Sequence, residues 1–326
     1  MKALVANGPG GPEVLKLADI PKPSPGSGEI LVRVCACALN PVDTKIRAGY
    51  LSDSRVYPTV YGYDVSGVVE SAGEGVEGFA PGDEVFYYAD LSRQGAYAEY
   101  HAVRASIVHK KPTGLTHVQA AALPLAGTTA WQGLFEMAKL AFGETVLIYG
   151  AAGGVGSMAV QMAAWAGANV IAVCSGANAE RVARLGANHV IDYQKASVPE
   201  AVMEITGGAG ADVALETIGG DVFFESFKSI KPFGRLVFLN AFAGDAPATL
   251  FNAARLKNLS IFFELARPDL RALDFVATLA ERGFIKPQVE SVISMENVAE
   301  GHRRLETRHG WGKIVVEISR RKYFRH

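Results

Sequence analysis

The segment from Val146 to Arg181 constrains the fold of this chain more than any other part of the sequence. It reads "VLIYGAAGGVGSMAVQMAAWAGANVIAVCSGANAER": an apolar run, a glycine turn, an alanine-rich stretch and a second apolar run. This succession is typical of a strand, a tight turn, a helix and a second strand. Strands joined in this way lie parallel in a sheet that helices cover on both faces. The segment therefore predicts a doubly wound α/β domain.

The glycine turn "GAAGGVG", residues 150–156, matches a GxGxxG pattern with Ala151 in its first position. Glycine lets the backbone approach a pyrophosphate closely, and the N–H groups at the start of the following helix attract phosphates. The pattern alone is a weak signal, but the flanking strand and helix make it specific for a dinucleotide. The alternative is a tight turn without a ligand. The turn residues that we expect at the dinucleotide are Gly150, Ala151, Gly153, Gly154 and Val155.

Where the second strand ends, the sequence has no acidic residue and continues as Cys174, Ser175 and Gly176. NAD sites usually place Asp or Glu here, where it accepts a hydrogen bond from the ribose 2′-hydroxyl. A carboxylate beside a 2′-phosphate would cost about 4 kcal/mol at a separation of about 4 Å and an effective dielectric constant of about 20. Ser175 and, one turn into the next helix, Arg181 therefore favour NADPH. As an alternative, Arg181 is simply a solvent-exposed cation.

The remainder of the chain predicts two domains. The first third has short β-branched or aromatic runs separated by turn sequences such as "SPGSG", which is typical of a small barrel-like domain. After Thr116 a helical stretch, with breaks at Pro124 and Gly127, leads into alternating strands and helices. The expected strands there are Val146–Tyr149, Asn169–Cys174, His189–Ile191, Asp212–Glu216, Arg235–Asn240 and Asn258–Leu265. Because the doubly wound domain is then complete, we expect the last segments to return to the first domain.

The composition excludes several classes of protein. The chain has 326 residues and a net charge of −1, so neither nucleic acid nor an acidic membrane is expected as its main partner. No apolar run is long enough to span a bilayer and no secretory signal is visible, which favours a cytoplasmic protein. The three cysteines, Cys35, Cys37 and Cys174, are too few for a disulfide scaffold and lack the spacing of metal ligands.

Five segments, in the order of the chain, carry a recognisable pattern: "EILVRVCACALNPVDTKIRAGY", "YGYDVSGVVESAGEGVEGFAPGDEV", "LPLAGTTAWQGL", "VLIYGAAGGVGSMAVQMA" and "GKIVVEI". Together they resemble the medium-chain dehydrogenase/reductase superfamily, and within it the zinc-independent quinone oxidoreductases, the zeta-crystallin-like group. The resemblance implies a GroES-like β-rich domain, residues 1–122 completed by 266–326, and a Rossmann-type NADPH-binding domain, residues 123–265. It also implies a homodimer, and the apolar run "NLSIFFEL" would make an edge strand that a partner covers.

The residues argue against catalytic zinc. Where zinc-dependent members of the superfamily have a cysteine and a His-Glu pair, this chain has Asn40, Tyr63 and Asp64. Catalytic zinc needs about three converging N, S or O ligands from the protein. The seven histidines are scattered along the chain without HxxxH spacing. We therefore expect no metal.

Four residues are candidates for a catalytic role at the acceptor, and the resemblance itself implies the first of them, Asn40. Asn40 would hydrogen-bond either a substrate oxygen or the nicotinamide ribose. Lys45 stands where the family commonly has a tyrosine, and it either provides a cation near the acceptor oxygen or points to solvent. Tyr50 and Tyr63, like Tyr61, either stack on a flat acceptor ring or pack in the core or at its rim.

For the cofactor, the resemblance implies contacts beyond the glycine turn. Thr128 matches a family position near the nicotinamide, although "AGTT" would also suit a helix cap. Tyr193 in "VIDY" matches a position at the adenosine phosphate, and Lys313 in "GKIVVEI" matches one at the cleft. Ligands bind at the carboxyl ends of parallel strands. The turns that follow the fourth and fifth strands therefore add Thr217, Asn240, Ala241 and Phe242.

We therefore predict an NADPH-dependent, zinc-independent oxidoreductase that transfers hydride to a quinone or a similar conjugated carbonyl. Such acceptors are electron-poor and can take hydride without the help of a Lewis acid. A site that positions them and excludes water can therefore suffice. One alternative is an NADPH-dependent enone or enoyl-thioester reductase of the same superfamily, which needs a proton donor at the α-carbon. Another is a non-catalytic, crystallin-like protein that binds NADPH.

Overall fold

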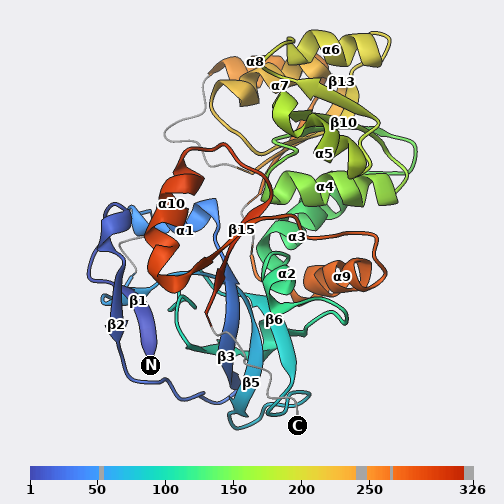
Figure 1. Cartoon of the computed structure of the whole chain (residues 1–326). Coiled ribbons are helices and arrows are strands. Elements are labelled where there is room, and N and C mark those ends of the chain that lie inside the picture. The colour runs from blue at the N-terminus through green and yellow to red at the C-terminus, as the bar shows by residue number, and fades with distance from the viewer. Residues whose placement is uncertain (51–54, 240–247, 265–266, 319–326) are drawn as a thin grey trace. The chain divides into compact units, whose positions relative to one another are not determined.

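The computed structural model describes residues 1–50, 55–239, 248–264 and 267–318 (Figure 1). The chain forms two compact units: unit 1 is Met1–Leu125, Arg267–Arg282 and Pro287–His326, and unit 2 is Ala126–Ala266 and Gly283–Lys286. The sequence placed the boundary at residues 122 and 123, whereas the units divide within helix α3 (Pro124–Trp131). The expected break at Pro124 is confirmed, but the one at Gly127 is wrong, because a glycine inside a helix costs only about 1 kcal/mol relative to alanine.

Unit 1 contains a seven-stranded sheet in the order β15-β16-β3-β5-β6-β8, with β7 paired to β3, and a three-stranded sheet in the order β2-β1-β4. The C-terminal strand β16 pairs antiparallel with β3, so the end of the chain lies in the same sheet as its first third (Figure 1). The strands are β1 (Lys2–Ala6), β2 (Lys16–Asp19), β3 (Glu29–Ala38), β4 (Thr59–Val60), β5 (Asp64–Ala72), β6 (Glu84–Tyr88), β7 (Tyr100–Arg104), β8 (His109–Lys110), β15 (Val289–Ser294) and β16 (Lys313–Glu317). The helices are α1 (Pro41–Arg47), α2 (His117–Ala121), α9 (Leu270–Glu281) and α10 (Val298–Glu306).

Unit 2 contains a six-stranded parallel sheet in the order β11-β10-β9-β12-β13-β14. In chain order this is 3-2-1-4-5-6, the order of a doubly wound dinucleotide-binding sheet. The strands are β9 (Thr145–Tyr149), β10 (Asn169–Cys174), β11 (His189–Asp192), β12 (Ala211–Glu216), β13 (Ile230–Phe238) and β14 (Ser260–Phe263). The helices are α4 (Gly154–Trp165), α5 (Ala179–Arg184), α6 (Val198–Ile205), α7 (Asp221–Ser229) and α8 (Ala248–Lys257).

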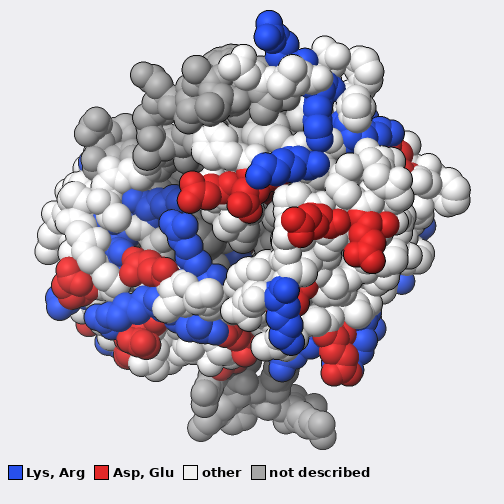
Figure 2. All heavy atoms as spheres, turned by 90° about the horizontal axis from the view of Figure 1, so that it is seen from above, with Lys and Arg blue, Asp and Glu red and all other residues white. Residues whose placement is uncertain are grey.

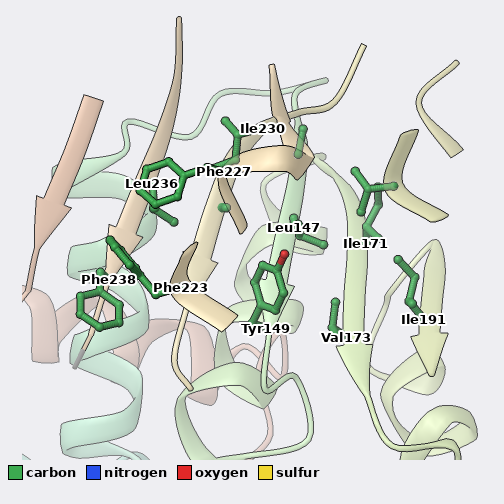
Figure 3. Packing of buried hydrophobic residues seen from close by; sticks show 13 residues of the cluster. Leu147, Tyr149, Ile171, Val173, Ile191, Phe223, Phe227, Ile230, Leu236 and Phe238 are labelled. Carbon is green, nitrogen blue, oxygen red and sulfur yellow. The ribbon is translucent and has the colours of Figure 1, made fainter. Parts of the chain in front are cut away.

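The core of unit 2 packs against one face of this sheet (Figure 3). Leu147 and Tyr149 of β9 point to this face, where Phe223 of α7 lies with its ring centroid 4.3 Å from that of Phe238. Ile148 is equally buried, and alternation along a strand directs it to the opposite face. Burial on both faces explains why β9 reads as an unbroken apolar run.

Among the described residues, no helix is both long and apolar enough to cross a membrane. On the face viewed in Figure 2, Lys and Arg side chains are interspersed with Asp and Glu, in keeping with the net charge of −1. The three cysteines are all buried, and none of them forms a disulfide bond. Buried thiol side chains pack in the way that small apolar side chains do.

Candidate cofactor and acceptor sites

The glycine turn after β9 requires glycine at two positions. Gly150 has a φ of +64°, and a Cβ there would lie 2.3 Å from Thr217 Oγ1. A Cβ on Gly156 would lie 2.2 Å from the carbonyl oxygen of Gly150. Helix α4 begins without a side-chain cap at its N-cap residue Gly153, so its first N–H groups can face a ligand. This cradle fits the pyrophosphate of a nicotinamide dinucleotide.

The other residues predicted in the turn lie at the carboxyl edge of the sheet. The N–H of Ala151 donates to the carbonyl oxygen of Val173 at 3.0 Å, which holds the turn against β10. Gly154 and Val155 are the first two residues of α4 and are half-buried. The turn therefore stands between the ends of β9 and β10, where the GxGxxG pattern requires it.

The three residues predicted for the adenosine phosphate follow β10 and β11. Ser175 comes directly after β10, is half-buried and accepts a hydrogen bond from Asn178 Nδ2 at 3.4 Å. Arg181 is exposed on α5. Tyr193 follows β11 and is 45% exposed. The sheet therefore brings these segments to the edge at which an adenosine ribose binds in such folds.

The same edge holds an acid that the sequence analysis missed. Asp192 is the last residue of β11 and lies opposite Cys174 in the parallel register. A Cβ on Gly176 would lie only 2.4 Å from Asp192 Oδ2, so the carboxylate rests against the segment that follows β10. The run "VIDY" contains this acid in the sequence. Only the pairing of β10 with β11 brings it beside Gly176.

The ends of β12 and β13 carry the remaining predicted cofactor residues. Thr217 Oγ1 donates to the carbonyl oxygen of Tyr149 at 2.9 Å and so links the ends of β12 and β9. Glu216 is fully buried, and its carboxylate accepts hydrogen bonds from the N–H groups of Ile218 and Gly219. Burial raises the pKa of Glu216, against the effect of these bonds. The predicted Asn240, Ala241 and Phe242 lie outside the described residues.

Thr128 lies inside α3 and is 1% exposed. It is therefore no helix cap, because α3 begins four residues earlier at Pro124. A π-helical turn, Gln132–Met137, follows α3 directly. Such turns frequently mark functional sites in helices.

In unit 1, Asn40, Asp64 and Lys313 form a buried cluster. Lys313 Nζ donates to Asp64 Oδ2 at 3.0 Å and also to Asn40 Oδ1. Asn40 Nδ2 donates to Asp64 Oδ2 at 2.9 Å. The other carboxylate oxygen, Asp64 Oδ1, accepts from the N–H of Leu125 at 2.7 Å. The ion pair is thus balanced and hydrogen-bonded, as a buried pair must be.

These residues do not fit a divalent metal ion. Asn40 Oδ1 and Asp64 Oδ2 both accept from the ammonium group of Lys313, so a cation already balances the carboxylate. Within the described ranges, no three His, Cys, Asp or Glu side chains are grouped closely enough to hold a metal ion. The Asn40–Asp64–Lys313 cluster is an internal ion pair and not a zinc site.

A second buried network starts at Asp43 in α1. Its Oδ2 accepts from the N–H of Asn40 at 2.9 Å and from the Tyr97 hydroxyl at 2.8 Å. The Tyr97 hydroxyl also lies 3.2 Å from His302 Nε2, and His302 Nδ1 lies 3.3 Å from Arg47 Nη1. Burial raises the pKa of Asp43 to about 7. Burial, helped by Arg47, lowers the pKa of His302 to about 3, so the imidazole is neutral at physiological pH.

The predicted acceptor residues differ in exposure. Tyr63 is fully buried, and among the described residues its hydroxyl makes no hydrogen bond of good geometry, although Arg55 lies near enough to oppose the rise of its pKa. Tyr61 shares both properties. Tyr50 is 49% exposed, and Lys45 is exposed on α1. A buried hydroxyl without a partner costs free energy unless a ligand or a water molecule accepts from it, so Tyr63 and Tyr61 are stronger candidates than Tyr50 and Lys45.

Two family models match the chain. The model "Alcohol dehydrogenase GroES-like domain" matches residues 26–113, and the model "Zinc-binding dehydrogenase" matches residues 154–277. The first match lies within unit 1, and the second includes helix α4 and most of the parallel sheet.

Known proteins are similar over almost the whole chain. A quinone oxidoreductase of Rattus norvegicus is 31% identical over 313 residues, which cover 94% of this chain and 94% of the relative. The mitochondrial NAD(P)H oxidoreductase RTN4IP1 of Bos taurus is 32% identical, with 89% of this chain and 82% of the relative covered. A solved NAD-dependent alcohol dehydrogenase is 35% identical with a TM-score of 0.93, covering 98% of this chain and all of the other.

The similarity thus extends through both the β-rich unit and the dinucleotide-binding sheet. It agrees with the cradle at the glycine turn and with the pairing of the C-terminal strand to the first domain. The chain belongs to the medium-chain dehydrogenase/reductase superfamily of nicotinamide-dependent oxidoreductases, among the relatives of the quinone oxidoreductases.

Proposed function

We propose that this chain is an NADPH-dependent oxidoreductase that transfers hydride to quinones or similar conjugated carbonyls without a metal. The observation that carries the proposal is the Asn40–Asp64–Lys313 cluster, in which an ammonium group already balances the buried carboxylate. An acceptor that needs no Lewis acid suits such a site. The similarity to quinone oxidoreductases supports the same substrate class.

Unit 2 would hold the cofactor, whose reduced nicotinamide supplies the hydride when it is bound. The turn at Gly150, Gly153 and Gly156 would cradle the pyrophosphate against the start of α4. Ser175 and Arg181 support a preference for the 2′-phosphate of NADPH, because neither repels it. Thr217 and Thr128 would orient the nicotinamide end of the cofactor.

At the acceptor, Asn40 and Tyr63 have different roles in this proposal. The Nδ2 of Asn40 donates to Asp64 and to the carbonyl oxygen of Ala38, and its Oδ1 accepts from Lys313. The amide is therefore fixed in orientation, with a lone pair of Oδ1 left for a ribose hydroxyl. Burial raises the pKa of Tyr63, so this hydroxyl stays protonated and can donate to the acceptor oxygen as negative charge develops there.

The partnerless hydroxyl of Tyr63 also suits the alternative, because an enone or enoyl-thioester reductase needs a proton donor. Steady-state oxidation of NADPH with 9,10-phenanthrenequinone, 1,4-benzoquinone or crotonyl-CoA separates the two activities. Turnover of the quinones supports the proposed function. Turnover of the thioester alone assigns the alternative, and tight NADPH binding without any turnover would indicate a non-catalytic protein.

We also propose that the protein is a homodimer joined through β14. This strand is the last in the order of the six-stranded sheet, and Phe263 at its end is 55% exposed. An edge strand presents unpaired N–H and C=O groups that another strand can pair with. A second copy of the same edge would satisfy these groups with twofold symmetry.

A further inference from the structure

The carboxyl edge of the parallel sheet contains a negative charge next to the segment that follows β10. Asp192 closes β11 in register with Cys174, and its Oδ2 would lie 2.4 Å from a Cβ on Gly176. Gly176 is the second residue after β10. In a doubly wound sheet the end of the second strand is where the adenosine ribose binds. A carboxylate contributed by the third strand is thus brought to the place where an NAD site has its acid.

The surroundings of Asp192 leave this charge only partly balanced. Its Oδ1 accepts from the N–H of Gln194 at 3.1 Å, which closes the turn after β11. Lys195 Nζ lies 3.7 Å from Oδ2, but the Lys195 side chain is 82% exposed, so solvent screens this pair. The Asp192 side chain itself is only 16% exposed. Burial, with a contribution from Asp192, raises the pKa of Cys174 to about 11, so this thiol stays neutral.

We propose that Asp192 determines cofactor specificity: it offers an acceptor to the 2′-hydroxyl of NADH and repels the 2′-phosphate of NADPH. The inference rests on the proposed function insofar as a nicotinamide dinucleotide binds at the glycine turn. Ser175 and Arg181 favour NADPH, and Asp192 opposes them from the neighbouring strand. The protein therefore binds NADH as well. Its preference for NADPH is smaller than it would be if only the missing acid at the end of β10 set the preference.

Fluorescence titration of the full-length protein with NADPH and with NADH tests this inference without any acceptor. The variant Asp192→Asn removes the charge and keeps the oxygen that accepts from Gln194. We expect the Kd for NADPH to fall roughly tenfold, the effect of removing one like charge several ångström from a phosphate near a protein surface. The Kd for NADH should change less than about threefold, because the amide oxygen still accepts from a hydroxyl.

The matched control is Glu180→Gln, which removes the same charge from α5. Glu180 pairs with Arg184 at 2.8 Å, and its side chain is 82% exposed. We expect this variant to leave the ratio of the two Kd values within about twofold of the wild type, because solvent screens the lost charge. If Asp192→Asn changes the ratio no more than Glu180→Gln does, the inference is wrong. Asp192→Ser, also uncharged, replaces Asp192→Asn if thermal unfolding shows the latter to be misfolded.

The titrations also separate this inference from the proposed function. If the wild type binds both dinucleotides and Asp192→Asn shifts the ratio, the inference holds even if no quinone is reduced. If quinones are reduced but the ratio does not shift, the proposed function holds and the inference fails. A wild-type chain that binds neither dinucleotide contradicts both.

Discussion

At the scale of single residues, two buried tyrosines of unit 1 differ in what their hydroxyl groups contact. The Tyr63 hydroxyl has no hydrogen-bond partner among the described residues, whereas the Tyr87 hydroxyl lies 2.9 Å from His101 Nδ1. Both side chains are fully buried. An unpaired buried hydroxyl costs free energy, whereas a buried hydrogen bond contributes about 1 kcal/mol to stability. In the proposed function Tyr63 would therefore serve the ligand, whereas the Tyr87 hydroxyl is already engaged with His101.

We expect Tyr63→Phe to lower kcat for quinone reduction about 100-fold, the loss typical of one hydrogen-bond donor to a developing oxyanion. Its free energy of unfolding should stay equal or rise slightly, because no intramolecular hydrogen bond is lost. The control, Tyr87→Phe, should do the opposite, with kcat unchanged and a loss of about 1 kcal/mol in stability. Steady-state kinetics and urea denaturation measure both effects. Full activity in Tyr63→Phe would remove Tyr63 from the mechanism.

Asp43 is the second residue whose burial has a measurable consequence. Its pKa in the folded chain is about 7, above the ordinary value of 3.8, mainly because the carboxyl group is buried. The hydrogen bonds from Tyr97 and Asn40 and the charge of Lys313 oppose this rise, whereas the charge of Asp64 adds to it. Between pH 4 and pH 7 the folded state thus keeps a proton that the unfolded state has lost. The contribution of Asp43 to stability is fully present below about pH 4 and is lost as the pH rises to about 7, by up to about 1.4 kcal/mol per pH unit.

Asp43→Asn should remove this dependence. His302 and His101 titrate with the opposite sign, since their pKa values are lowered to about 3 and about 4, but they are present in both proteins. The quantity to measure is therefore the difference in unfolding free energy between Asp43→Asn and the wild type, which should favour the variant by more at pH 7 than at pH 5. Glu77→Gln, at an exposed position, should show no such change between the two pH values. An unchanged difference in Asp43→Asn would show that Asp43 ionises normally.

At the scale of elements, two glycines of the turn between β9 and α4 are needed for different reasons. Gly156 is needed for packing, because a Cβ there would lie 2.2 Å from the carbonyl oxygen of Gly150. Gly153 has an extended backbone with φ of −77°, and a Cβ there would lie 3.3 Å from the same oxygen, which small shifts relieve. The fold itself therefore does not require glycine at position 153, whereas the proposed close approach of a pyrophosphate would.

We expect Gly156→Ala to cost about 1–3 kcal/mol in stability, the usual effect of overpacking, and also to weaken dinucleotide binding. Gly153→Ala should keep the stability within about 1 kcal/mol, because its backbone conformation is open to any residue. It should nonetheless raise the Kd for NADPH at least tenfold. Thermal unfolding and fluorescence titration measure the two effects. If Gly153→Ala binds NADPH as the wild type does, the pyrophosphate does not lie against this turn.

At the scale of the whole molecule, the exposed edge of the parallel sheet predicts the oligomeric state. Phe263→Lys places a charge on the edge strand and should convert the proposed dimer into a monomer at micromolar concentration. Leu256→Lys is the matched control, since Leu256 is 79% exposed on α8 and does not lie on the edge strand. Sedimentation velocity measures both. A wild-type monomer at the same concentration contradicts the dimer outright.

The sequence by itself determined the order and type of the elements, because hydrophobic periodicity and turn chemistry act over a few residues. The strand-turn-helix-strand segment around Gly153, the six parallel strands and the return of the last strand to the first domain were all predicted. The family resemblance added Asn40 and Lys313 as separate candidates, and the aromatic side chain added Tyr63, without their mutual contacts.

Only the tertiary structure decided which side chains meet. Lys313 contacts Asn40 across 273 positions of the chain, and its ammonium group balances the charge of Asp64. Asp43 joins His302 through Tyr97, and Asp192 reaches the end of β10 from another strand. These contacts depend on sheet pairing and burial, which no local pattern encodes. The charges and the burial of these side chains, and not the order of the elements, determine which chemistry the fold can carry out.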